Sequence, residues 1–216
     1  MIKKMNKVNK LQILAWTLSI IVCVIAFAAW FPSLHGKFVG VSTYRLFPLF
    51  GLLAFSLMWS HYAVSGIRTY LKIPSESLGS YFELSSLAVL AVLLLHPGLL
   101  AWQLWRDGLG LPPGSYLKNY VAPSLGWVAI LGIVSWFVFL TYELRRKFRA
   151  RTWWKYVQYA SDAAMVAIFY HGLRLGAQLQ SGWLRGVWFF YGVTFLVSIC
   201  IIYGSKFTDR SIIEKV

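Results

Sequence analysis

Six apolar segments, each close to 20 residues long, dominate this chain of 216 residues. A helix needs about 20 apolar residues to cross the hydrocarbon core of a bilayer. The segments are Leu11–Phe31, Tyr44–His61, Phe82–Trp105, Val121–Tyr142, Trp154–Leu175 and Trp183–Tyr203. Because they occupy most of residues 1–216, the sequence predicts one all-α domain, a polytopic membrane protein built as a bundle of six transmembrane helices. No room is left for a separate soluble catalytic domain.

Basic residues are unevenly divided between alternate connections, which predicts the orientation of the chain. Lysine and arginine favour the cytoplasmic side of a membrane protein. With the N-terminus inside, the inner segments hold 15 of the 21 basic residues and the outer segments hold 6. We therefore expect a multi-pass protein of the plasma membrane with both termini in the cytoplasm. This topology and contact with anionic lipid account for most of the net charge of +14, so no nucleic-acid partner is expected.

Two histidines lie inside the apolar segments, His96 in the third and His171 in the fifth. An ionisable side chain in hydrocarbon is costly, and it marks a candidate functional site. His96 follows Glu83 by 13 residues and His171 follows Trp154 by 17. At about 1.5 Å per residue, both lie roughly 20–25 Å from the inner boundary, in the outer half of a core about 30 Å thick. A pair at matched depth on two helices can hold a haem iron from both faces.

The approach to the fifth segment carries a recognisable pattern. A basic loop, residues 145–151, leads to Trp154 and Lys155, and His171 follows Gln158 by 13 residues. This pattern resembles the ferric-reductase-like transmembrane superfamily. That group includes the NADPH oxidases, the STEAP metalloreductases and the membrane haem subunit of the bacterial periplasmic methionine sulfoxide reductase system. Its usual motif is Trp-Lys-x-x-His at the inner end of the fifth span, with a second histidine 13 residues later.

The chain departs from the family pattern at two inner positions. Gln158 stands where the fifth span would carry its first histidine, and Phe82 stands 14 residues before His96, where the third span would carry its own. The resemblance therefore implies one haem b in the outer leaflet, with His96 and His171 as its metal ligands and no inner haem. This is similar to the STEAP arrangement, in which a flavin uses the inner site. It implies a ferric-reductase-like electron-transfer subunit, and whether the chain is itself an oxidoreductase enzyme stays open.

The outer end of the fifth segment carries a candidate partner for the haem propionates. Two imidazoles fill both axial positions of a haem iron and leave no site for oxygen, which favours electron transfer. The propionates would point outward, and Arg174 lies three residues after His171 on a neighbouring face. The alternative for Arg174 is a side chain that reaches the interface without a ligand. Further candidates are Arg106, Lys118 and Arg185.

The inner half needs its own route for electrons, because one outer haem does not connect the two sides. The chain would need a flavin or a quinone at the cytoplasmic side, or a separate donor such as a quinol or a flavoprotein. Gln158 and Asp162 are the candidate cofactor-binding residues there. Asp162 could accept a proton from a quinol or pair with Arg68 or His61. The alternative is that Gln158 and Asp162 only form hydrogen bonds between helices.

Two functions follow from the sequence. The first is a b-type haem protein that passes electrons to an acceptor at the outer face, either ferric iron or a periplasmic redox partner. The second is a non-redox membrane scaffold or assembly protein in which the histidines serve helix packing. A metal-dependent membrane hydrolase is disfavoured because the chain contains no HExxH motif. The donor, the acceptor, the role of His61 and the oligomeric state are not fixed by the sequence.

Overall fold

The structure of the protein, a computed structural model, describes residues 2–34, 41–143 and 150–213. Residues 145–149 of the predicted basic loop lie outside the described residues. Within the described ranges every regular element is an α-helix or a short 3₁₀-helix, so the predicted all-α fold class is confirmed.

Each of the six apolar segments forms a long helix. These helices are α1 (Ile2–Trp30), α2 (Thr43–Tyr70), α3 (Gly79–Arg106), α5 (Gly126–Glu143), α7 (Trp154–Leu175) and α8 (Trp183–Ile213). The bounds of α7 are those predicted, whereas α2 continues from His61 to Tyr70. The shorter elements are η1 (Phe31–Leu34), η2 (Ser75–Leu78), α4 (Gly114–Asn119), η3 (Pro123–Leu125) and η4 (Ala177–Leu179).

Five of the long helices are long and apolar enough to cross a membrane. They cover Lys7–Leu34, Thr43–Tyr70, Glu76–Arg106, Pro123–Tyr142 and Trp183–Phe207. The helix α7 has the length but not the apolarity, since Lys155, Gln158, Asp162, His171 and Arg174 all lie on it. Of the six expected spans, five have the composition of membrane helices, and α7 is the sixth long helix.

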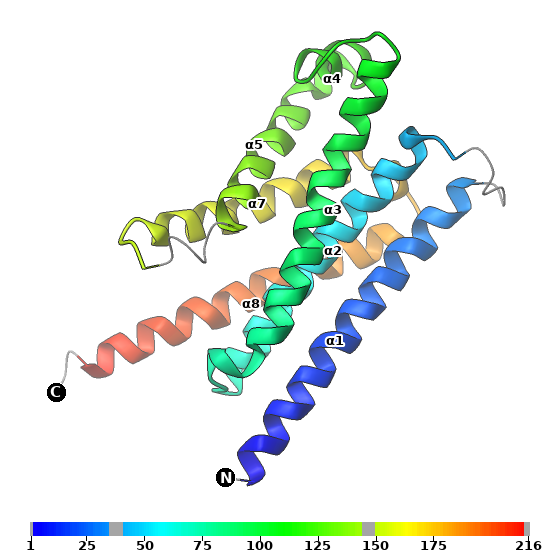
Figure 1. Ribbon diagram of the computed structural model, residues 1–216. Helices are drawn as coiled ribbons and strands as arrows, with labels where there is room; N and C mark the ends of the chain where they lie inside the picture. The colour runs from blue at the N-terminus through cyan, green and yellow to red at the C-terminus, as the bar shows by residue number, and fades with distance from the viewer. Residues whose placement is uncertain (1, 35–40, 144–149, 214–216) are drawn as a thin grey trace.

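The helices form two groups, one around α2 and one consisting of α5 and α7. The helix α2 packs extensively against α1, α3 and α8, while α5 packs mainly along α7 (Figure 1). An aromatic cluster joins α2 to α8: Phe55 stacks on Trp188 with ring centroids 4.1 Å apart, and Trp59 stacks on Tyr191 at 4.2 Å. Large apolar side chains also cover the outside of the bundle, as expected of helices in contact with lipid. They include Ile13, Val24, Leu87, Phe137 and Val193.

Candidate functional site

The imidazole of His96 on α3 is held by the backbone of α2. Its Nδ1 lies 2.8 Å from the carbonyl oxygen of Phe47, and the Phe47 ring packs beside it with centroids 5.5 Å apart. A carbonyl oxygen can only accept a hydrogen bond, so Nδ1 carries the hydrogen and is the donor. The other ring nitrogen, Nε2, is therefore left with a free lone pair, which is the form that binds a metal.

The imidazole of His171 on α7 is held in the same way by α5. Its Nδ1 lies 2.9 Å from the carbonyl oxygen of Val128 and donates to it, which again leaves Nε2 as the free nitrogen. A metal-binding histidine almost always donates its second ring N–H to a carbonyl or a carboxylate, which fixes the tautomer and the ring orientation. Both histidines of the predicted pair have this second hydrogen bond.

A glycine on the supporting helix makes room for each ring. A Cβ at Gly51 would lie 2.6 Å from Cε1 of His96, and a Cβ at Gly132 would lie 2.5 Å from Cε1 of His171. Each glycine follows by four residues the carbonyl that accepts the hydrogen bond, so both contacts to a ring come from one turn of one helix. The pairs α2–α3 and α5–α7 therefore present their histidines by the same local design. Sequence reasoning identified the histidines but missed both glycines.

His96 and His171 occupy equivalent positions on their helices. His96 lies 17 residues after the first residue of α3, and His171 lies 17 residues after the first residue of α7. Both side chains are partly buried.

The donor set suits a haem better than a bare metal ion. Among the described residues no group of three or more histidine, cysteine, aspartate or glutamate side chains could hold a metal. Structural and catalytic zinc sites need three or four protein ligands. A haem iron already has four porphyrin nitrogens and needs only the two axial ligands that His96 and His171 offer.

The turn of α3 that carries His96 is tied to two other elements. Pro97 has no backbone N–H, so the carbonyl of Leu93, four residues earlier, lacks its usual partner within the helix. The indole Nε1 of Trp136 on α5 donates to that carbonyl at 2.9 Å. The hydroxyl of Tyr116 on α4 donates to the carbonyl of Pro97 at 2.9 Å, and burial raises the pKa of Tyr116 to about 12, so it stays protonated.

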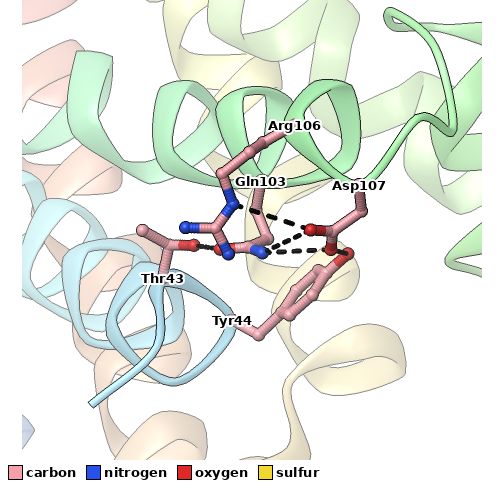
Figure 2. Close-up of polar contacts among 5 residues, drawn as sticks. All are labelled: Thr43, Tyr44, Gln103, Arg106 and Asp107. Atoms are coloured by element: carbon pink, nitrogen blue, oxygen red, sulfur yellow. Dashed lines mark hydrogen bonds and ion pairs between the residues drawn. The ribbon is translucent and has the colours of Figure 1, made fainter. Parts of the chain in front are cut away.

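A polar cluster joins the N-terminal end of α2 to the C-terminal end of α3, two turns beyond His96 (Figure 2). Gln103 is buried and donates from Nε2 to both carboxylate oxygens of Asp107 at 3.0 Å, while it accepts from the hydroxyl of Thr43. Tyr44 donates to Asp107 at 2.9 Å, and Arg106 lies 3.6 Å from the same carboxylate. The Gln103 amide and the Tyr44 hydroxyl hold the pKa of Asp107 below its ordinary value.

The basic residues considered for the propionates differ in their surroundings. Arg106 is paired with Asp107. Arg185 donates from Nη1 to the carbonyls of Leu179 and Gln180, at 3.3 Å and 2.9 Å, so it closes the connection between α7 and α8. Arg174 and Lys118 are exposed at the ends of α7 and α4.

Asp162 accepts hydrogen bonds from two tyrosines, which is the interhelical alternative that the sequence left open for it. It accepts a hydrogen bond from the hydroxyl of Tyr62 on α2 at 2.7 Å and another from the hydroxyl of Tyr203 on α8. The carboxylate therefore joins α7 to α2 and α8, as the interhelical alternative predicted for it. These partners could not be predicted from the sequence, because no local spacing links Asp162 to Tyr62 or Tyr203 among the 12 tyrosines of the chain.

His61 has a different tautomer from that of the histidine pair. Its Nε2 lies 2.7 Å from the hydroxyl oxygen of Ser85, and that hydroxyl donates to the carbonyl of Tyr81 at 2.7 Å. Ser85 has already used its proton, so His61 donates from Nε2 and has no lone pair on that nitrogen. Phe82 packs against the His61 ring, with centroids 5.5 Å apart.

The other inner candidate, Gln158, is partly buried on α7 one turn before Asp162. The site therefore consists of two oriented imidazoles and, nearer the start of α7, a carboxylate bound by two tyrosines. Comparison of the chain with protein-family models, with curated proteins and with solved structures finds no match.

Proposed function

We propose that this protein is a membrane b-type haem protein that transfers electrons through one bis-histidine haem. The observation that carries the proposal is the shared geometry of His96 and His171. Each ring donates a hydrogen bond from Nδ1 to a backbone carbonyl, packs directly against a glycine and leaves the lone pair of Nε2 for a metal. A histidine that serves only helix packing does not require these features. Their repetition on a second pair of helices therefore favours a shared role as ligands.

The residues of the chain would do three things for a bound haem. His96 and His171 would hold the iron through Nε2 and occupy both axial positions, so that oxygen has no open coordination site. The carbonyls of Phe47 and Val128 would fix the ring orientations and increase the basicity of the ligands. When bound, the haem would supply a one-electron iron couple.

The electron acceptor in this proposal lies at the outer face. With both termini in the cytoplasm and α7 as the fifth of six spans, the histidine pair would lie in the outer half of the membrane. The acceptor would be ferric iron or a periplasmic redox partner, and Arg174 would lie near the propionates. Membership of the ferric-reductase-like superfamily and location in the plasma membrane are parts of the same proposal.

The inner half would receive electrons from a separate donor, a quinol or a flavoprotein, or through a flavin or quinone bound near Gln158 and Asp162. Neither Gln158 nor Phe82 can ligate haem iron as histidine does. His61 directs an N–H, not a lone pair, at Ser85. These features support one haem per chain.

The experiment that tests the function is haem reoxidation. The purified protein, reduced with dithionite under anaerobic conditions, is mixed with ferric citrate and followed by its haem absorbance. The wild type and the H61A control are expected to carry haem and to be reoxidised, whereas H96A and H171A are expected to lose low-spin haem. A colourless wild type whose histidine variants change only stability would support the scaffold alternative instead.

A further inference from the structure

Trp136 connects the two halves of the candidate site. Its indole Nε1 donates at 2.9 Å to the carbonyl of Leu93, the group that Pro97 deprives of its usual donor. In apolar surroundings an unpaired carbonyl is costly, so a donor from outside the helix matters more here than it would in water.

The position of this bond relates it to both imidazoles. Trp136 lies one turn after Gly132 on α5, and Gly132 is the residue on which His171 rests. Leu93 lies three residues before His96 on α3. The bond therefore joins the helix that orients one histidine to the turn that carries the other. Overall, α3 and α5 pack against each other much less than α3 packs against α2 or α5 against α7.

We infer that Trp136 is a positioning residue that sets the spacing and mutual orientation of the two axial ligands; this inference rests on the proposed haem function. Pro97 makes this positioning role possible. Because Pro97 lacks a backbone N–H, the Leu93 carbonyl accepts a hydrogen bond from the Trp136 indole on α5. The geometry of α3 near His96 therefore depends on α5.

The test compares W136F with W127F, a matched control on the same helix. Trp127 is exposed, and its ring stacks on Tyr170 with centroids 5.4 Å apart. The readouts are the low-spin EPR signal of the ferric haem and the rate of haem transfer to apomyoglobin. W136F is expected to shift the EPR signal and to release haem about tenfold faster, as for loss of a supporting hydrogen bond. W127F is expected to match the wild type.

A second variant links the effect to the Leu93 carbonyl. P97A restores a backbone donor for that carbonyl, so W136F should change the EPR signal and the release rate much less in the P97A background. If W136F alone does not fold, the W136F/P97A protein is compared with P97A instead. The two are expected to have similar EPR signals and haem release rates.

Two results would overturn the inference. One is a W136F protein with the wild-type EPR signal and release rate, and the other is an equal effect of W136F in both backgrounds. In either case a wild type that holds haem would leave the proposed function intact. A wild type without haem would overturn both.

Discussion

The imidazole of His171 lies directly against Gly132, with no room between them for a β-carbon: a Cβ at position 132 would be 2.5 Å from Cε1 of the ring. His96 and Gly51 repeat this relationship at 2.6 Å. Each candidate ligand is therefore aimed by a helix that contributes no ligand itself. Four helices, not two, define the proposed haem site.

The first prediction concerns Gly132. Alanine at this position would push the His171 ring away from α5 and weaken its hydrogen bond to Val128. We expect G132A to bind haem at least about tenfold more weakly, the usual effect of losing the second hydrogen bond of a ligating histidine. The measurement is haem titration of the apoprotein, and G51A should behave alike.

The control for these variants is G98A. Gly98 is on α3, two residues after His96, and a Cβ there would have no heavy atom within 4 Å. G98A is expected to bind haem as the wild type does. Equal affinities for G132A and G98A would contradict the role given to the glycine.

The second prediction concerns the tyrosines bound to Asp162. Y62F and Y203F each remove one hydroxyl that donates to the carboxylate. Interhelical hydrogen bonds in membrane proteins contribute about 0.6 kcal/mol on average and about 1.7 kcal/mol at most. We expect each variant to unfold with a free energy lower by an amount in this range, measured in mixed micelles.

Tyr159 supplies the control, because its ring packs near Tyr203, 5.9 Å between centroids, and it is exposed. Y159F should leave the stability unchanged, and all three variants should keep the wild-type haem spectrum. If Y62F and Y203F altered the spectrum but not the stability, the cluster would belong to a cofactor site and not to helix packing.

The third prediction is a pH dependence at the C-terminal end of α3. The hydrogen bonds from Gln103 and Tyr44 lower the pKa of Asp107 below its ordinary value of 3.8, against a smaller effect of burial. For a carboxylate with a lowered folded-state pKa, the stabilisation is complete above the ordinary value and is lost as the pH falls through the lowered one. The wild type should therefore be more stable than D107N at neutral pH.

That difference should shrink as the pH falls below 3.8, as monitored by thermal unfolding of both proteins in the same detergent. A difference that persists unchanged into strong acid would mean that the carboxylate charge does not stabilise the cluster.

The sequence was sufficient to predict the helices and the histidine pair, for simple physical reasons. Long apolar runs have few alternatives to membrane helices, and a histidine within such a run stands out. The acceptors for His96 and His171 were not predictable, because they are backbone carbonyls, which every residue has. Gly51 and Gly132 left only a weak signal, because a glycine within the preceding helix gains meaning only when the register between helices is known.

The partners of Pro97 and Asp162 show the same limit. Proline predicts which carbonyl loses its donor, here that of Leu93, but the replacement by Trp136 depends on how α3 and α5 face each other. For Asp162 the sequence left open a proton acceptor, a partner of Arg68 or His61, and a hydrogen bond between helices. Its partners Tyr62 and Tyr203 lie 100 and 41 residues away in the chain. Such contacts follow from tertiary packing and not from local spacing.

The fourth prediction is that α7 crosses the membrane despite its polar residues. In a protein with Cys23 and Cys200 replaced by serine, the variants T152C and S181C place a single thiol near either end of α7. In intact cells an impermeant maleimide should label S181C and leave T152C unlabelled until the membrane is opened. Labelling of both positions from one side would contradict the six-span topology.

The most direct test of the central claim is a reduced-minus-oxidised optical spectrum of the purified wild type, with haem quantified per chain. The account predicts the sharp α-band of a low-spin b-type haem at one haem per chain, lost in both H96A and H171A. A protein without haem, or one whose haem spectrum survives replacement of either histidine, would contradict it.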